Sequence, residues 1–170
     1  GETHSAQTRM RVGYIALAID LQVPKRIAAD ELDSLTINTL NLNNEFEAAQ
    51  GKVVIERLDM PKQSFIDRYW SKPDQELMSE YEFKKAFPQY AYQKEDEAQS
   101  WKTTATILDK AFNTAESKTL DLSKIDWEAG AYKLTIQSKD RYGQAVEKEE
   151  QFTIYDWDKK NMALEEMAWQ

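Results

Sequence analysis

The side chains that most often carry out chemistry in proteins are scarce in this sequence. The 170 residues include no cysteine, which excludes disulfides, thiolate metal ligands and a cysteine nucleophile. The single histidine, His4, stands in a polar N-terminal stretch, where a Ser-His-Asp triad has little to support it. We interpret His4 as a solvated tail residue. No histidine pair or Cys/His cluster is present to bind zinc.

Carboxylates are the remaining candidates for catalysis or metal binding. Asp30, Glu31 and Asp33 form one acidic group, and residues 94–97 form another. Both lack the alternating Asp/Asn spacing and the fixed glycine of a calcium-binding loop, so solvated acidic loops are favoured. A glycosidase pair is defined by carboxylate separation in space, and nothing in the sequence singles out one pair. The sequence therefore predicts a protein that is not an enzyme and has no cofactor or metal.

Aromatic side chains between residues 61 and 102 are the best candidate for a binding surface. Aromatic rings stack on sugars and anchor protein partners. The candidate partner-binding residues are Tyr69, Trp70, Tyr90 and Tyr92. The favoured alternative is that the rings form a small core and dock this segment onto the rest of the domain. Such a long excursion needs apolar burial to offset the entropy lost on ordering.

The acidic run from Glu147 to Glu150 is a weaker candidate. Three glutamates surround Lys148 on the last predicted strand, which suggests a partner-binding stripe. We favour the alternative that these charges protect an edge strand from unwanted pairing with other chains.

The overall charge limits the classes of partner. The net charge is −8, which disfavours nucleic acid and anionic lipid because both require a basic face. No apolar run approaches the roughly 20 residues of a membrane-spanning helix, so direct membrane insertion is not expected. At 41% hydrophobic residues, the chain can form a substantial core.

A β-hairpin in residues 127–155 is the clearest structural element. Leu134 and Ile136 alternate with polar residues on the first strand, and Phe152 and Ile154 do so on the second. Strict alternation is typical of a half-buried strand. We therefore expect these four side chains to be buried together.

Five further strands are predicted from alternation and β-branched residues. Their ranges are 11–23, 34–40, 51–58, 103–113 and 119–122. With the hairpin they make seven strands without alternating helices, which favours an all-β antiparallel sandwich over a parallel α/β sheet.

A partly helical insertion is predicted at about residues 60–102, between the third and fourth strands. Ser79 and Glu82 have the spacing of a capping box, and Pro88 ends the helix that begins there. Phe83 and Phe87 are four residues apart and share one helical face, which we expect to contact the sandwich.

Several segments resemble the macroglobulin-like domain of alpha-2-macroglobulin family proteins from Bacteroides-type bacteria. Residues 130–134, 140–143 and 152–155 resemble the end of that domain. Residues 70–83 resemble the insertion seen in this bacterial group, and residues 41–43 resemble the turn after the second strand. The hairpin pattern is shared with other sandwiches, so the insertion is the more specific part of the resemblance.

The resemblance covers roughly residues 9–155 and implies an immunoglobulin- or fibronectin-like sandwich within a large protease-trapping inhibitor. Such proteins contain a bait region and often a Cys-x-Glu-Gln thioester. The thioester is excluded from this chain by the lack of cysteine, and no catalytic residue of the family can be assigned. Residues 1–8 are expected to be disordered or a linker, and residues 156–170 a linker or the start of another domain.

The implied function is that of a non-catalytic scaffold domain. Its partners would be neighbouring domains of the parent protein and the proteases that the parent engages. The expected location is the periplasm or the outer cell envelope. The alternative is a cell-surface binding module that recognises glycan or protein through the aromatic insertion.

Overall fold

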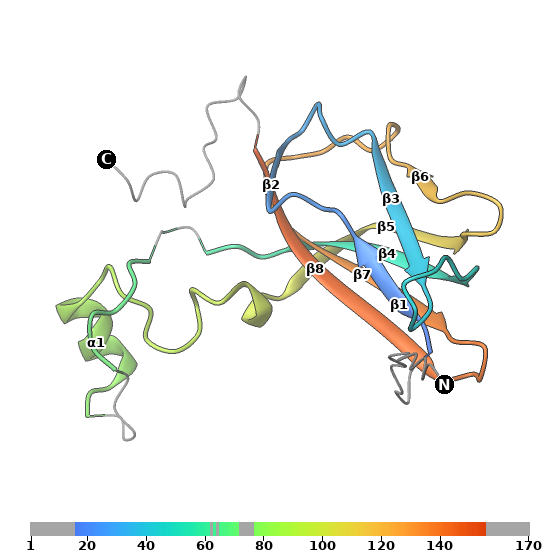
Figure 1. Ribbon diagram of the computed structural model, residues 1–170. Helices are drawn as coiled ribbons and strands as arrows, with labels where there is room; N and C mark the ends of the chain where they lie inside the picture. Colours follow the sequence, from blue (N-terminus) through green and yellow to red (C-terminus); the bar gives the residue numbers. More distant parts are fainter. Residues whose placement is uncertain (1–15, 62, 64, 72–76, 156–170) are drawn as a thin grey trace, which may run out of the picture.

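The computed structural model describes residues 16–61, 63, 65–71 and 77–155. Both predicted terminal segments and the start of the first predicted strand, residues 11–15, lie outside these ranges. The described residues form eight strands, one α-helix and one short 3₁₀ helix (Figure 1). The strands are β1 (Ala18–Leu21), β2 (Arg26–Ala28), β3 (Ser34–Leu40), β4 (Gln50–Leu58), β5 (Thr103–Asn113), β6 (Thr119–Asp121), β7 (Gly130–Lys139) and β8 (Ala145–Tyr155).

The strands form two sheets that face each other. The smaller sheet has the order β1-β3-β6, and the larger has the order β2-β8-β7-β4-β5. The predicted all-β class is therefore confirmed. The predicted count of seven strands, all antiparallel, is not confirmed: β2 is an eighth strand and pairs with β8 in parallel, from Arg26 beside Thr153 to Ala28 beside Tyr155. The chain leaves the smaller sheet after Leu21, passes Pro24, which has no amide hydrogen to donate, and joins the larger sheet as β2.

The core lies between the inner faces of the two sheets. β7 pairs with β4 on one side and β8 on the other, which places Ile136 beside Val53 and Leu134 beside Ile55. These four side chains are at most 1% exposed. Burial of Leu134, Ile136, Phe152 and Ile154 was predicted from the hairpin pattern and is confirmed.

Three aromatic rings close one end of this core. Tyr132 and Phe152 are stacked with their centroids 5.6 Å apart, and Trp127 meets both rings edge-on. The polar atoms of the buried rings are also satisfied, since Trp127 Nε1 donates to the Leu32 carbonyl at 3.2 Å. This bond links the segment before β7 to the segment before β3.

Asp140 fixes the tip of the β7–β8 hairpin. Its Oδ1 accepts the N–H groups of Tyr142 (2.9 Å) and Gln144 (2.8 Å), and Gly143 adopts the positive φ of 83° that the turn requires. Its Oδ2 accepts the N–H of Ala16 at 3.0 Å, which attaches the segment before β1 to the hairpin. These hydrogen bonds, that from Ala16 foremost, lower the pKa of Asp140 below its ordinary value of 3.8, although burial acts in the opposite direction.

The insertion between β4 and β5 is present, and it contains the predicted helix. Helix α1 (Glu80–Ala86) begins after Ser79, whose hydroxyl accepts the Glu82 N–H at 3.3 Å. The Glu82 carboxylate in turn accepts the Ser79 N–H at 3.0 Å, which completes the predicted capping box. The hydroxyl and amide hydrogen bonds from Ser79 lower the pKa of Glu82.

We predict that Phe152→Ala lowers the free energy of unfolding by about 3–5 kcal/mol, because it leaves a cavity among buried rings. Urea denaturation measures this loss. Tyr142→Ala is a matched control in the same hairpin, since the Tyr142 side chain is 70% exposed, and it should change stability by less than about 0.5 kcal/mol. Equal losses for the two variants would contradict the core assignment.

We predict that Asp140→Asn destabilises the protein at neutral pH but not in strong acid. Because the folded-state pKa of Asp140 is depressed, its stabilisation is fully present above the ordinary value of 3.8 and is lost as the pH falls through the lower folded value. Asparagine retains an oxygen for the turn but not the charged acceptor for Ala16. Denaturation midpoints of both proteins should converge as the pH falls below 3.8; a constant difference at all pH values would contradict this origin.

Candidate functional site

The insertion contains a second apolar centre, which we call the aromatic lobe (described residues of 65–92). Figure 1 shows this lobe and α1 to one side of the two sheets. Phe83 is the buried residue of α1, at 8% exposure. Its ring lies 5.3 Å from Phe87 and 5.4 Å from Tyr92, measured between centroids, and the Arg68 guanidinium lies 4.7 Å from its centroid.

Hydrogen bonds to backbone carbonyls hold the two chain segments of the lobe together. Arg68 Nη2 donates to the carbonyls of Ala91 and Tyr92, the latter at 3.0 Å. The Ile66 N–H donates to the Gln89 carbonyl at 2.8 Å. One arginine therefore both covers the Phe83 ring and joins the segment before α1 to the segment after it.

The predicted orientation of α1 is wrong. Phe83 and Phe87 share a face, as their spacing indicated, but that face contacts other rings of the lobe and not the sandwich. None of the lobe's rings belongs to the core cluster of the sandwich within the described residues. The physical reason is that five rings of this segment suffice for a small core of their own, and they are Trp70, Phe83, Phe87, Tyr90 and Tyr92.

The structure divides the four predicted site residues into two pairs. Tyr90 is 9% exposed, and Tyr92 is partly buried with its hydroxyl donating to the Met78 carbonyl at 2.9 Å. These two residues build the lobe. Tyr69 and Trp70 are 90% and 43% exposed and remain accessible to a partner.

Phe87 is the accessible residue that the sequence reasoning missed. It is 38% exposed, and its ring centroid lies 6.0 Å from that of Trp70. We call Trp70 and Phe87 the ring patch. The patch rests on Tyr90, whose centroid is 4.9 Å from Trp70 and 6.5 Å from Phe87.

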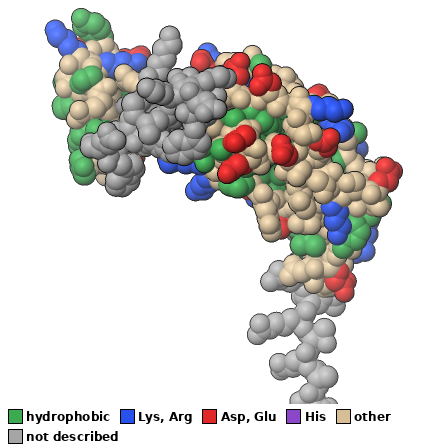
Figure 2. Space-filling model, turned by 90° about the horizontal axis from the view of Figure 1, so that it is seen from above, with side chains coloured by type: hydrophobic (Ala, Val, Ile, Leu, Met, Phe, Trp, Pro, Cys, Tyr) green, Lys and Arg blue, Asp and Glu red, His purple; other side chains and the backbone are tan. Residues whose placement is uncertain are grey.

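Exposed apolar side chains are concentrated in the lobe. Of the nine large hydrophobic side chains that are exposed in the described part of the chain, seven belong to it. They are Ile66, Tyr69, Trp70, Leu77, Met78, Tyr81 and Phe87. Figure 2 shows hydrophobic side chains on the surface of this lobe at the left of the molecule. Exposed apolar surface of this kind marks sites of contact with other molecules.

The carboxylates do not assemble into a recognisable centre. Across the described ranges, no group of three or more Asp, Glu or His side chains is placed to hold a metal ion. Asp30, Glu31 and Asp33 are exposed, and His4 lies outside the described residues. Every fully buried side-chain nitrogen or oxygen in the described part has a hydrogen-bond partner.

The acidic run lies on an open edge of the larger sheet. β2 pairs only with residues 153–155 of β8, so residues 145–152 have no second strand beside them in the described structure. Lys148 and Glu150 form an ion pair at 2.8 Å, and Glu147 and Glu149 are exposed. This placement agrees with charges that protect an edge strand.

Comparison of the chain with protein-family models, with curated proteins and with solved structures gives no match. No helix within the described residues is long and apolar enough to cross a membrane.

We predict that Phe83→Ala loosens the aromatic lobe while leaving the sandwich intact, because the two apolar clusters share no ring. Amide hydrogen exchange should accelerate over residues 80–92 and remain unchanged in β7. Tyr81→Ala is the matched control on the same helix, since Tyr81 is 76% exposed, and should leave exchange unchanged. Loss of protection throughout β7 would show that the lobe and the sandwich form one cooperative unit instead.

Proposed function

We propose that this chain is a non-catalytic scaffold domain of a large alpha-2-macroglobulin-like protein that traps proteases. The observation that carries the proposal is the exposed ring patch on a lobe that has its own core. A sandwich supplies a rigid body, and the lobe offers Trp70 and Phe87 to a neighbouring domain. Buried aromatic anchors dominate the energy of many protein contacts, so even a small patch of this kind can set domain orientation.

The strand order supports the finer assignment to a macroglobulin-like, immunoglobulin- or fibronectin-like sandwich. β1 and β2 can be counted as two parts of one first strand that changes sheets around Pro24. The count is then seven, with β1-β3-β6 in one sheet and β8-β7-β4-β5 in the other. Two facing sheets with a first strand divided between them are consistent with this class of sandwich.

Most segments that resemble the bacterial family lie in two parts of the fold. Residues 130–134, 140–143 and 152–155 belong to the β7–β8 hairpin. Of the stretch 70–83, residues 77–83 include the start of α1 and its cap, and residues 72–76 lie outside the described residues. Under this proposal the direct partners are neighbouring domains, and the proteases are partners of the parent protein. The proposed location is the periplasm or outer cell envelope, without enzymatic activity or cofactor in this domain.

A cell-surface binding module is the second candidate. The observation that favours it is the exposure of Tyr69, whose side chain is 90% exposed next to Trp70 in the sequence. An accessible tyrosine next to an accessible tryptophan suits recognition of a glycan or of a separate protein.

We predict that Trp70→Ala in the parent protein reduces protease trapping, whereas the isolated chain inhibits no protease with or without the change. Trapping is measured as protection of a large protein substrate from a protease mixed with the parent. The amides around Trp70 should also exchange more slowly in the parent than in the isolated chain, because a neighbouring domain covers them.

The matched control is Tyr142→Ala, which removes an exposed ring from the sandwich hairpin and should leave trapping unchanged. Inhibition of a protease by the isolated chain would contradict the scaffold role. Binding of the isolated chain to a glycan array, abolished by Trp70→Ala, would favour the second candidate.

A further inference from the structure

A cavity of about 650 Å³ lies between the end of the insertion and the outer face of the larger sheet. We call it the Trp101 cleft. One wall is the 3₁₀ helix η1 (Ala98–Ser100) with Trp101, a second is residues 149–153 of β8, and Lys25 and Arg26 at the start of β2 form a third. This volume falls in the range of roughly 300–1,000 Å³ that is typical of small-molecule sites.

Residues of the larger sheet form the floor of the cleft. Ala131 of β7 pairs with Thr153 of β8, and both line the cavity beside Leu58 at the end of β4. Ala131 is 4% exposed and has no side chain beyond its Cβ, so it forms a closed part of the floor and adds little bulk to the cavity. Leu58 is 5% exposed and supplies an apolar floor under η1.

Trp101 is held in a fixed position at the end of the cleft. Its indole Nε1 donates to the Glu95 carbonyl at 2.8 Å, and its backbone N–H donates to the Ala98 carbonyl at 3.2 Å. The ring is partly exposed. A fixed, half-open indole is a preorganised platform for a ligand, since little side-chain entropy is lost on binding.

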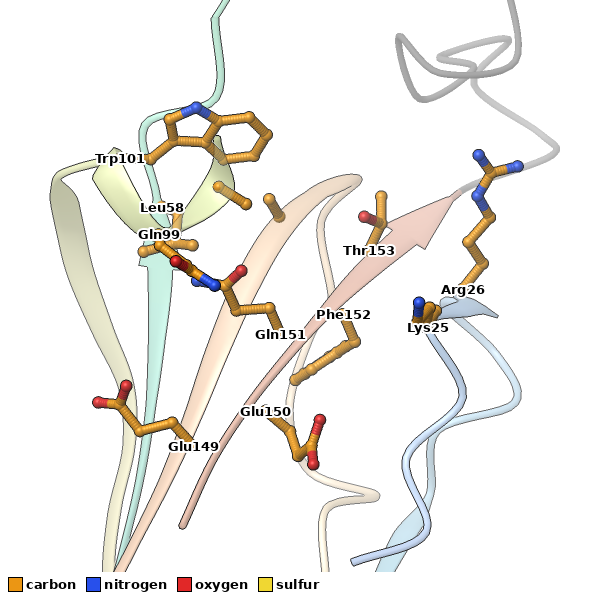
Figure 3. A pocket seen from close by; sticks show the side chains of 12 residues that line it. Lys25, Arg26, Leu58, Gln99, Trp101, Glu149, Glu150, Gln151, Phe152 and Thr153 are labelled. Carbon is orange, nitrogen blue, oxygen red and sulfur yellow. The ribbon is translucent and has the colours of Figure 1, made fainter. Parts of the chain in front are cut away.

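Polar side chains with unused hydrogen-bonding capacity face the same space. In Figure 3, the amides of Gln99 and Gln151 point toward one another below Trp101, and Glu149 lies farther along β8. Within the described residues, neither amide has a hydrogen-bond partner. Each amide offers two donors and an acceptor, and the Glu149 carboxylate offers acceptors.

We infer that the Trp101 cleft binds a neutral saccharide. The positively polarised C–H groups on one face of a sugar ring suit the negative face of an indole. Sugar hydroxyls both donate and accept, which matches two amides and a carboxylate. The lining carries two carboxylates, Glu149 and Glu150, and two cations, Lys25 and Arg26, so its formal charges balance and favour a neutral sugar over an ionised one.

An extended peptide suits this cleft less well than a saccharide. A peptide that adds a strand needs free backbone groups at a sheet edge. Residues 149–152 of β8 have such an edge, but the charges of Glu149 and Glu150 protect it. At the end of the cleft, residues 153–155 already have β2 at that edge. The inference goes beyond the scaffold role and uses none of the ring-patch residues.

The test is titration of the complete chain with four neutral disaccharides: maltose, cellobiose, chitobiose and mannobiose. Binding is followed by isothermal calorimetry and by chemical-shift changes of the tryptophan indole N–H groups, up to about 10 mM ligand, where weak sites become visible. We expect at least one disaccharide to bind and to shift the Trp101 indole signal. Trp101→Ala and Gln151→Ala should each weaken that binding by about tenfold or more.

Tyr142→Ala is the matched control, because it removes an exposed aromatic side chain from the β7–β8 hairpin, outside both the cleft and the ring patch, and should leave the affinity unchanged. A circular dichroism spectrum and a urea midpoint equal to those of the unchanged protein show that a variant remains folded. If Trp101→Ala does not fold, the affinity of Gln151→Ala decides the test. The absence of binding to all four disaccharides would overturn the inference. Loss of binding in Trp70→Ala alone, preferential binding of glucuronic acid, or occupation of the cleft only by a lysine-rich peptide would also overturn it.

Discussion

Pairing of β7 with strands on both sides is the interaction on which the rest of the fold depends. β7 carries Tyr132, Leu134 and Ile136 on its inner face, all at most 1% exposed, between β4 and β8. β5 is attached through β4 and β2 through β8, so the larger sheet is assembled around this one strand. The smaller sheet then covers the inner face. Its buried Ile37 and Leu35 complete a core that belongs to one cluster.

The second constraint is the separate core of the aromatic lobe. Because Phe83 is buried by rings and by Arg68 from within the insertion, the sandwich does not need the lobe for its own packing. The lobe can therefore present apolar side chains outward without weakening the main core. Its return to β5 brings Trp101 over the sheet, so the same insertion creates both the ring patch and the wall of the Trp101 cleft.

Features that depend on residues close together in the chain were predicted correctly from the sequence. Alternation identified the hairpin strands, and the spacing of Ser79 and Glu82 identified the helix cap. β2 was missed because three residues are too few to show periodicity, and its partner β8 lies at the other end of the chain. The spacing of Phe83 and Phe87 showed that they share a face but not what covers it. Residue type likewise could not separate buried Tyr90 from accessible Trp70, since exposure depends on contacts between distant segments.

The parallel pairing of β2 with β8 has a mechanical consequence. The first described residues lie near the hairpin tip, whereas β8 runs from that tip to Tyr155 at the opposite end (Figure 1). Tension applied between Ala16 and Tyr155 therefore pulls β2 and β8 along their length in opposite directions. The bonds from Thr153 to Lys25 (2.9 Å) and from Ala29 to Tyr155 (3.0 Å) are then loaded together in shear and do not open one at a time. A domain built this way resists stretching along the chain and acts as a stiff link between its two ends.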